Sequence, residues 1–553
     1  MGFILRMSIW GNDMAAAGTK KWWKNAIVYQ IYPRSFCDSN GDGIGDIPGI
    51  ISKLNYLKNL GVDVIWLSPV YPSPGYDNGY DISEYKGINP EFGTMEDMER
   101  LISRAKRLGI RIIMDLVINH TSDEHEWFKK ALAGDPKYRK YYLFSDKPNN
   151  WGSFFGNRTW TKTENGDYYL HLFSEKQPDL NWQNPDVYDE IADVMRFWLD
   201  KGISGFRCDV INIIYKNSLS NGRRRLILTG REHYLNTEGC HELLQRFNKE
   251  IWSNYKTFIV GETILVTPNE AKLLCDENRG ELDAIFFFEH MDVDSRGGVK
   301  WLKKRYKPDK LIRILDKWQN ALEIPANYLE NHDQVRSVNH FGNTKEYWEK
   351  SAKLLCGLNL SLKGIPFIFE GEEIGMTNGD FRGLRDIKDI ESYNINQAMK
   401  RMLLTHKLRR KLILRTSRDN ARTPVQWDSS ENAGFTSGEP WLRINENKSY
   451  INVETETEDE NSILNFYKQM IDFRKNSKAL SEGTYRKVAA PSDVYIFTRE
   501  AKDERLYIYC NLSSSNRSVE FYGDRIIFGN YPSVERDNQY LKPYEFRIIA
   551  SNI

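Results

Sequence analysis

Long apolar runs and an excess of one charge are both missing from this chain of 553 residues. No run of 18 apolar residues occurs, so we expect no membrane-spanning helix. The 77 Lys and Arg residues almost balance the 76 Asp and Glu residues, which leaves a net charge of +1. No field of one sign therefore favours nucleic acid or an anionic membrane surface as a partner.

Cysteines are few and widely scattered. The six occur without a CxxC pair and without the spacing of a disulfide-rich domain. We expect reduced, buried thiols in a cytoplasmic protein, which we also expect to be a monomer. The apolar patch near the start is interrupted by Arg6 and is too short for a signal peptide. We interpret residues 1–20 as an N-terminal tail.

A pattern of helix end, glycine and strand recurs along the chain. It is clearest in LKNLGVDVIWLSP (57–69), KRLGIRIIMD (106–115) and DKGISGFRCD (200–209). Strands of this kind are predicted at 27–33, 62–68, 111–117, 203–209, 257–262, 282–288, 327–332 and 364–370. Eight strand-helix units favour an α/β fold of the (β/α)8 TIM-barrel type over a doubly wound sheet.

Two of the predicted helices carry signals of their own. One has a single apolar stripe, formed by Ile47, Ile50, Ile51, Leu54 and Leu57. Another is preceded by Thr94, with Asp97 three residues later, which resembles a capping box. In the second helix the apolar residues Met98, Leu101, Ile102 and Ala105 follow, so both helices have a face that can pack against a sheet.

Two stretches interrupt the repeat and divide the chain into domains. Residues 118–183 are too long for an ordinary loop and are rich in aromatic residues, so we expect an inserted subdomain after the third strand. Short β-rich runs dominate residues 483–553, which predicts a C-terminal all-β domain of the sandwich type. The barrel then comprises residues 21–117 and 184–482.

Polar residues gather where the predicted strands end, which is where barrel enzymes place their active sites. They are Asp115, Asn119 and His120 after the third strand, Arg207 and Asp209 on the fourth, Glu262 on the fifth, and His332 and Asp333 after the seventh. Any one of the acids could cap a helix, and a lone histidine is more often part of a core. Together they predict an active site.

Arg207 and Asp209 lie two positions apart in an apolar strand, so their side chains share a face. A buried ion pair adds little stability, which favours a functional role. Retaining glycoside hydrolysis needs two carboxyl groups about 5–5.5 Å apart. We expect Arg207 to lower the pKa of Asp209 and so keep it ionised as the nucleophile. We expect an apolar setting to raise the pKa of Glu262, the general acid. Asp333 can stabilise the positive charge of the transition state.

Four motifs, DLVINH (115–120), GFRCDVIN (205–212), VGET (260–263) and ENHD (330–333), resemble those of the α-amylase family, glycoside hydrolase family 13. The resemblance extends over most of the chain and is greatest to the oligo-1,6-glucosidase and α-glucosidase branch. It implies that Asp209 is the nucleophile, Glu262 the acid/base and Asp333 the transition-state stabiliser. It also implies a small oligosaccharide as the substrate and no cofactor for catalysis.

The resemblance further implies a closed pocket for one glucose unit, and hence release of glucose from non-reducing ends. The residues implied to contact this unit or to line the pocket are Asp77, Tyr80, His120, Phe155, Phe173, Gln177, Arg207, His332 and Arg418, with Arg418 as the partner of Asp77.

The segment DSNGDGIGD (38–46) follows a calcium-loop pattern. Its candidate ligands are Asp38, Asn40, Asp42, the Ile44 carbonyl and Asp46. Position 12 of the pattern is Gly49, so the bidentate glutamate is missing. The resemblance implies a structural Ca²⁺ or Mg²⁺, whereas a glycine-rich turn with solvated acids is the alternative.

Val210, directly after the proposed nucleophile, bears on the choice of glycosidic bond. In this branch valine accompanies α-1,6 linkages, and alanine or threonine accompanies α-1,4 linkages.

Two segments depart from the branch pattern, namely residues 263–265 (TIL) and residues 215–244. The arginines at 223–225 leave trehalose 6-phosphate open as a rival substrate, because arginine suits phosphate.

Other functions remain as alternatives. Transglucosylation or sucrose isomerisation would use the same intermediate. A metal-dependent hydrolase is disfavoured because no HxH or HExxH pair occurs and Arg207 would compete with a metal ion. A non-catalytic interaction protein is disfavoured because it has no need for three acids at one focus.

Overall fold

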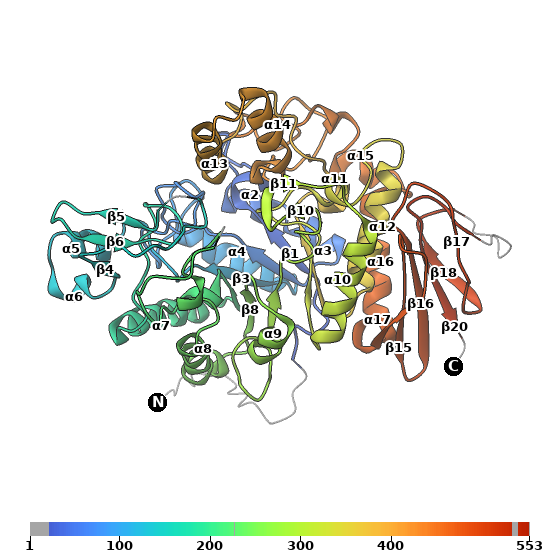
Figure 1. The fold of residues 1–553 in the computed structure, drawn as a ribbon. Coiled ribbons are helices and arrows are strands. Elements are labelled where there is room, and N and C mark those ends of the chain that lie inside the picture. The colour runs from blue at the N-terminus through green and yellow to red at the C-terminus, as the bar shows by residue number, and fades with distance from the viewer. Residues whose placement is uncertain (1–20, 157, 226, 533–539, 552–553) are drawn as a thin grey trace, which may run out of the picture.

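A parallel eight-stranded sheet forms the centre of the computed structural model, which describes residues 21–156, 158–225, 227–532 and 540–551 (Figure 1). The strand order is β12-β13-β1-β2-β3-β7-β8-β9, and contact between β9 and β12 closes the barrel. The strands are β1 (Val28–Ile31), β2 (Val64–Leu67), β3 (Arg111–Leu116), β7 (Gly205–Cys208), β8 (Phe258–Glu262), β9 (Ala284–Phe286), β12 (Ala326–Asn327) and β13 (Ile365–Phe369). The predicted barrel is confirmed.

The seventh barrel strand is shorter than predicted. β12 ends at Asn327, so residues 328–332 do not continue it. The Tyr328 carbonyl accepts a hydrogen bond from His290 at 2.8 Å, and the Tyr328 hydroxyl donates to the Phe287 carbonyl at 2.9 Å. These bonds anchor the segment outside a strand ladder, and the ENHD motif lies in the loop that follows.

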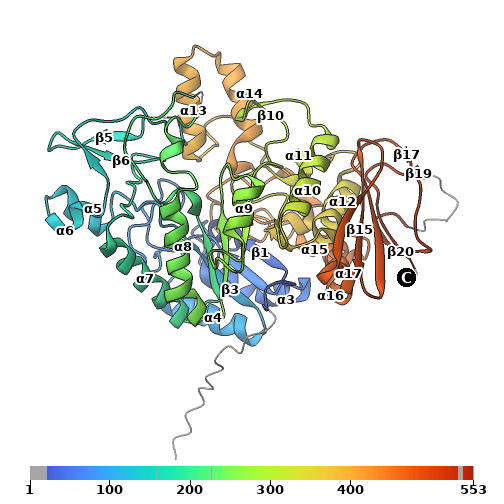
Figure 2. The ribbon, with the colours of Figure 1, turned by 60° about the horizontal axis from the view of Figure 1, so that its bottom comes forward.

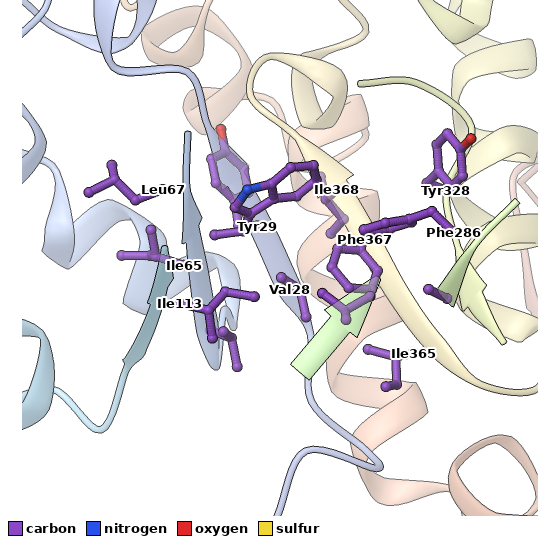
Figure 3. Close-up of a cluster of buried hydrophobic side chains, with 14 of the residues drawn as sticks. Val28, Tyr29, Ile65, Leu67, Ile113, Phe286, Tyr328, Ile365, Phe367 and Ile368 are labelled. Atoms are coloured by element: carbon purple, nitrogen blue, oxygen red, sulfur yellow. The ribbon is translucent and has the colours of Figure 1, made fainter. Parts of the chain in front are cut away.

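Apolar side chains fill the inside of the barrel (Figure 3). Phe286 meets Phe367 edge-on with ring centroids 4.6 Å apart, and it meets Tyr328 at 5.4 Å. Strands that are buried on both faces need such continuous apolar sequence. Because this interior is a packed core, polar residues of the strands can only gather at the barrel's ends.

The two helix signals in the sequence are confirmed, with one change. The apolar stripe is buried, but Lys53 divides it between α2 (Ile47–Ser52) and α3 (Leu54–Leu60). The capping box of Thr94 and Asp97 opens α4 (Met95–Arg107). Further helices around the sheet are α7 (Pro185–Asp200), α8 (Glu238–Glu250), α9 (Pro268–Leu274), α10 (Pro308–Ala321), α12 (Trp348–Ser361) and α16 (Ile463–Asn476).

The inserted and C-terminal segments lie on opposite sides of the barrel (Figures 1 and 2). The insertion contains α5 (Glu126–Leu132), α6 (Pro136–Arg139) and a sheet of β4 (Phe144–Ser145), β6 (Tyr168–Leu170) and β5 (Trp160–Lys162). The C-terminal segment forms an antiparallel sheet of β14 (Thr484–Val488), β15 (Val494–Ala501), β16 (Glu504–Asn511), β20 (Phe546–Ser551) and β18 (Arg525–Gly529). A second sheet pairs β17 (Arg517–Ser518) with β19 (Tyr540–Leu541).

Neither a disulfide nor a membrane-length helix is found in the described ranges. All six cysteines are free thiols, five of them buried and Cys275 half-buried. No helix within those ranges combines the length and the apolar character needed to cross a bilayer.

A cluster of buried carboxyl groups lies behind the carboxyl end of β13. It comprises Glu370, Glu372, Glu373 and Glu456, with Arg336 beside Glu370. The Tyr29 hydroxyl, for example, donates to Glu373 at 2.8 Å. Burial raises the pKa of Glu456 to about 9, because an ionised carboxylate would lose its hydration there. Glu456 is therefore protonated in the folded protein at neutral pH.

This burial predicts a pH-dependent stability. The pKa of Glu456 is raised on folding from about 4.3, so its contribution is complete at low pH and is lost as pH rises toward 9. We expect the free energy of unfolding to fall less steeply between pH 5 and 9 in Glu456→Gln than in the natural protein, measured by urea unfolding. Glu454→Gln, an exposed change on the same helix, is the control and should keep the natural slope. Equal slopes in all three proteins would refute the assignment.

Candidate active site

A pocket of about 230 Å³ contains the three predicted catalytic acids, Asp209, Glu262 and Asp333. It lies where the barrel strands end, and side chains of the insertion form part of its wall. A larger cavity of about 650 Å³ borders the C-terminal sheet and holds none of the predicted site residues. The convergence of acids from β7, β8 and the loop after β12 therefore marks the smaller pocket as the candidate active site.

Most of the other predicted residues line the same pocket. Those at its surface are Asp77, Tyr80, His120, Phe155, Phe173, Val210 and Arg418. Gln177, Arg207 and His332 lie behind the surface and hold the lining residues in place. The predicted residues thus form one site with two layers.

Arg207 is the centre of the site's charge network. Its side chain is buried, with the whole residue 1% exposed. Nη1 lies 2.7 Å from Oδ1 of Asp209 and also contacts Asp115, while Nη2 lies 2.6 Å from Oε2 of Glu262. One guanidinium therefore contacts three carboxyl groups, and it fixes the positions of both proposed reacting groups.

The predicted electrostatic division between the two acids is wrong in part. Burial raises the pKa of Asp209, Arg207 lowers it, and the Glu262 carboxyl raises it again; the net direction is upward. Glu262 is also not in a purely apolar setting, because its Oε2 contacts Arg207 and accepts a hydrogen bond from the Val210 amide at 3.1 Å.

Asp333 is held in its ionised form. Burial alone would raise its pKa, but the surrounding positive groups keep it well below its usual range. Arg422 lies 2.8 Å and Arg418 3.2 Å from Oδ1. Burial lowers the pKa of His332 to about 3, so this imidazole is neutral at pH 7, and Arg418, Arg422 and Lys300 supply the positive charge that keeps Asp333 ionised there.

His332 is oriented from both sides. Its Nδ1 lies 2.7 Å from Nε2 of Gln30, a residue of β1. Its ring stacks on that of Tyr80 with centroids 5.2 Å apart and planes 3° apart. The Tyr80 hydroxyl in turn donates to Oδ2 of Asp115 at 3.1 Å. These contacts direct Nε2 of His332 toward Asp333, at 3.3 Å.

An ion pair is present at the predicted place between Asp77 and Arg418. Nη2 of Arg418 lies 2.9 Å from Oδ1 of Asp77. Gln177 donates to Oδ2 of Asp77 at 3.1 Å, and its amide nitrogen lies 3.1 Å from Nε2 of His120. Burial lowers the pKa of His120 to about 4, so it too is neutral at pH 7. This group presents both charges and neutral donors to one side of the pocket.

Aromatic rings of the insertion continue the wall beside this group, with Phe155 5.7 Å from the Arg418 guanidinium carbon and Phe173 5.2 Å from the His120 ring. Phe173 stacks on Phe154 with centroids 4.9 Å apart, and it meets Phe155 at 5.6 Å.

The backbone of Val210 is left-handed, with φ of 36°, an uncommon conformation for a β-branched residue. In this conformation the Val210 backbone amide points at Glu262. The residue that was predicted to select the glycosidic linkage therefore also donates a hydrogen bond to the proposed acid/base.

Several residues of the site escaped the sequence interpretation. Arg422 belongs to the same SRDNAR stretch (417–422) as Arg418, which could have identified it. Asp389 pairs with Arg418 at 2.6 Å and caps α13 (Ile390–Arg401), but no sequence signal distinguished it. Lys300, on β11 (Val299–Lys303), and Glu391 lie 2.8 Å apart at the pocket's edge.

Hydrogen bonds to its own side chains hold the calcium-like loop together. Asp38 accepts hydrogen bonds from backbone amides within the loop, and Asn40 and Asp42 each accept one from the amide two residues on. Ile44 provides the amide at 2.9 Å from Asp42. Asp46 instead caps α2 through the Gly49 amide at 2.6 Å. No three His, Cys, Asp or Glu side chains of the described ranges are grouped closely enough to hold a metal ion.

Comparison with known proteins settles the family. Residues 30–483 match the sequence profile of the alpha amylase catalytic domain. The protein belongs to the α-amylase family. It is therefore a glycoside hydrolase, as the motifs predicted.

Relatives within the family extend over nearly the whole chain. The chain is 45% identical to an oligo-1,6-glucosidase of Parageobacillus thermoglucosidasius, over 95% of this chain and 98% of that protein. It is 40% identical to a trehalose-6-phosphate hydrolase of Bacillus subtilis, over 95% and 97%. The crystal structure of isomaltulose synthase from Klebsiella sp. LX3 superposes with a TM-score of 0.93 at 38% identity, over 96% of this chain and 100% of that chain.

The arrangement predicts a severe loss of turnover when the proposed nucleophile is replaced. We expect Asp209→Asn to lower kcat by about 10⁴-fold or more, which corresponds to about 5 kcal/mol, because an amide cannot form the glycosyl ester. Arg207 keeps two carboxylate partners in this variant, so the fold should persist, as circular dichroism would check. Asp189→Asn, an exposed change on α7, is the matched control and should retain activity. Near-normal turnover by Asp209→Asn would contradict the role.

Proposed function

We propose that the protein is a retaining, exo-acting α-glucosidase that prefers α-1,6-linked glucose at the non-reducing ends of short oligosaccharides. The observation that carries the proposal is the joint attachment of Asp209 and Glu262 to one buried guanidinium in a pocket closed by Asp77 and Arg418. Oligo-1,6-glucosidases from several bacteria, 43–45% identical over nearly the whole chain, support it.

The proposed reaction has two steps. The Asp209 carboxylate attacks the anomeric carbon while the carboxyl group of Glu262 gives its proton to the departing glycosidic oxygen. A water molecule then loses a proton to the Glu262 carboxylate and displaces Asp209, which releases α-glucose. Asp333, held ionised by Arg418 and Arg422, stabilises the positive charge on the sugar ring in both steps.

Exo action follows from the shape and contacts of the pocket. Its volume of about 230 Å³ lies below the range of about 300–1,000 Å³ typical of sites for larger ligands. The Asp77–Arg418 pair and Gln177 close one end, and Phe155, beside Arg418, and Phe173, beside His120, extend the wall from there. One terminal sugar can enter, and the rest of the substrate must extend outward through the opening.

Phosphate recognition is not favoured by the arginines after β7. Of the three at 223–225, only Arg225 borders a cavity beside the pocket, and its Nε lies 3.6 Å from Glu232. Lys300 is likewise paired with Glu391. Both cations at the entrance are therefore partly neutralised, so trehalose 6-phosphate is the weaker candidate. The α-1,4 linkage and transfer of glucose to a sugar acceptor remain alternative outcomes of the same chemistry.

Substrate comparison tests the proposal. We expect kcat/KM for isomaltose to exceed that for maltose, sucrose, trehalose and trehalose 6-phosphate, with α-glucose as the first product by NMR. Val210→Thr should lower the isomaltose-to-maltose ratio several-fold, because it alters the side chain next to the leaving group while keeping the β-branch. Ile203→Val, a buried change just before β7 at a residue outside the pocket lining, is the control. An unchanged ratio in Val210→Thr would remove Val210 as the selector, and β-glucose as the product would refute retention.

We also infer that the 38–46 loop binds a hard cation for structural purposes. The loop offers only oxygen donors, from Asp38, Asn40, Asp42 and the Ile44 carbonyl, which suit Ca²⁺ or Mg²⁺.

We also propose that the protein is a cytoplasmic monomer, and its free thiols support the cytoplasmic location. Gel filtration tests the oligomeric state.

Cation removal tests the loop. We expect millimolar Ca²⁺ to raise Tm by several degrees over EDTA, because saturation at about 100 Kd stabilises by about 2.7 kcal/mol. Asp42→Ala, at an exposed loop position, should abolish the difference without changing turnover. Equal Tm values in EDTA, Ca²⁺ and Mg²⁺ would exclude the site.

A further inference from the structure

Two exposed apolar side chains lie where α13 turns into α14 (His406–Thr416). Met402 is 72% and Leu403 is 89% exposed, and no other large hydrophobic residue in the part of the chain that the structure describes is as exposed. Both helices lie at the edge of the molecule in either view (Figures 1 and 2). Single exposed apolar residues are common on proteins, but adjacent ones this far exposed are typical of a surface that contacts a partner.

The hairpin of α13 and α14 does not need these two side chains for its own packing. It is held by a separate apolar cluster that includes Met399, Leu404 and Trp301 of β11. Met402 and Leu403 lie outside this cluster, although Leu404 is the next residue in the chain. The apolar surface of the two residues is therefore available to something outside the chain.

The backbone at Leu403 is a second, independent observation. α13 ends in a Schellman motif, in which the Leu403 amide donates to the Lys400 carbonyl at 3.0 Å and the Leu404 amide to the Met399 carbonyl at 3.1 Å. Leu403 occupies the left-handed position of this motif, with φ of 60°, where glycine or asparagine is usual. A leucine there is strained and is hardly buried, which favours a role for its side chain in an external contact.

The segment around these residues is strongly basic. Residues 392–418 contain eight Lys and Arg residues and no Asp or Glu, although the whole chain is nearly balanced in charge. Lys400, Arg401, Lys407 and Lys411 are exposed, and none of them has a carboxylate partner within the described ranges. The balanced total thus conceals a local positive field at this end of the molecule. We call residues 400–411 the hairpin tip.

An anionic lipid surface matches this combination of groups. Acidic head groups attract each nearby lysine or arginine with a gain of about fivefold in affinity, and methionine and leucine can enter the boundary between head groups and acyl chains. A nucleic acid would bind the cations but would leave the apolar side chains in water. A second copy of the chain would bring like charges together. The lipid surface is therefore the occupant that both features favour.

We propose that the hairpin tip docks reversibly on membranes that contain anionic lipids. Met402 and Leu403 enter the interfacial layer, and the surrounding cations contact the phosphate groups of the lipids. Glu391, at the other end of α13, lines the active-site pocket, and the 12 residues of this helix span about 18 Å. The docking surface and the catalytic site are thus separate, and the inference does not depend on which glucoside is hydrolysed.

Vesicle sedimentation tests the proposal. We expect the protein to bind mixed phosphatidylglycerol and phosphatidylcholine vesicles at least tenfold more tightly than vesicles of phosphatidylcholine alone at low salt. Raising the salt concentration to about 0.5 M should remove most of this binding, because the cations are then screened. Equal binding to both kinds of vesicle, or binding to neither, would overturn the proposal.

Replacement of Leu403 by glycine separates membrane binding from folding. Leu403→Gly removes the apolar side chain and suits the left-handed backbone, so Tm should stay unchanged or rise while affinity for anionic vesicles falls by about fivefold or more. Leu265→Gly is the matched control, because Leu265 is also left-handed, with φ of 51°, and is 48% exposed. It should leave vesicle affinity unchanged. The proposal fails if Leu403→Gly binds vesicles as the natural protein does.

Removal of cations tests the electrostatic part. Lys407→Gln combined with Lys411→Gln should lower the affinity for anionic vesicles by about tenfold or more and should weaken its salt dependence. Lys106→Gln combined with Arg107→Gln removes two exposed cations from α4 and should have no such effect. Equal losses in both pairs would show a general charge effect and would contradict the assignment to the hairpin tip.

The other occupants give different results. A nucleic acid partner predicts binding of oligonucleotides that Lys407→Gln with Lys411→Gln weakens and Leu403→Gly does not. A second copy predicts a dimer in gel filtration that Leu403→Gly dissociates. Either result in a protein that does not bind anionic vesicles would overturn the proposal.

Discussion

The burial of one positive charge constrains the whole site. Arg207 lies at the end of β7, out of contact with bulk water, and a buried guanidinium needs acceptors for its N–H groups, a need that acidic side chains meet while also balancing its charge. Asp115 on β3, Asp209 after β7 and Glu262 on β8 meet this need. These strands are neighbours in the barrel, so their register determines where the two proposed reacting groups lie.

A second constraint comes from the barrel's interior. Its space is filled by side chains such as Phe286 and Phe367, which leaves only the strand ends for polar chemistry. The substrate pocket is consequently assembled from loops. Asp77 and Arg418, 341 positions apart, meet there, and the insertion supplies Phe155 and Phe173. The same loops leave a second cavity of about 360 Å³ beside the pocket.

Much of this architecture could be predicted from sequence because its signals are local. Glycine stops and apolar runs located the eight barrel strands, and Thr94 with Asp97 located the start of α4. Signals of this kind failed where distant groups decide the outcome. The net direction of the pKa shift of Asp209 depends on burial and on Glu262, and the early end of β12 accompanies Tyr328 contacts with His290 and Phe287. No local sequence pattern identified Asp389 as part of the site.

The sequence by itself indicated the family, the (β/α)8 barrel and three acids that the structure places in one pocket, because short motifs and periodic apolar residues record them directly. Only the tertiary structure decided that Arg207 binds Glu262 as well as Asp209, that His332 is neutral, and that Ile227 faces a cavity beside the catalytic pocket. The physical reason is that charge and desolvation depend on every group within a few ångströms. Those groups come from all parts of the chain.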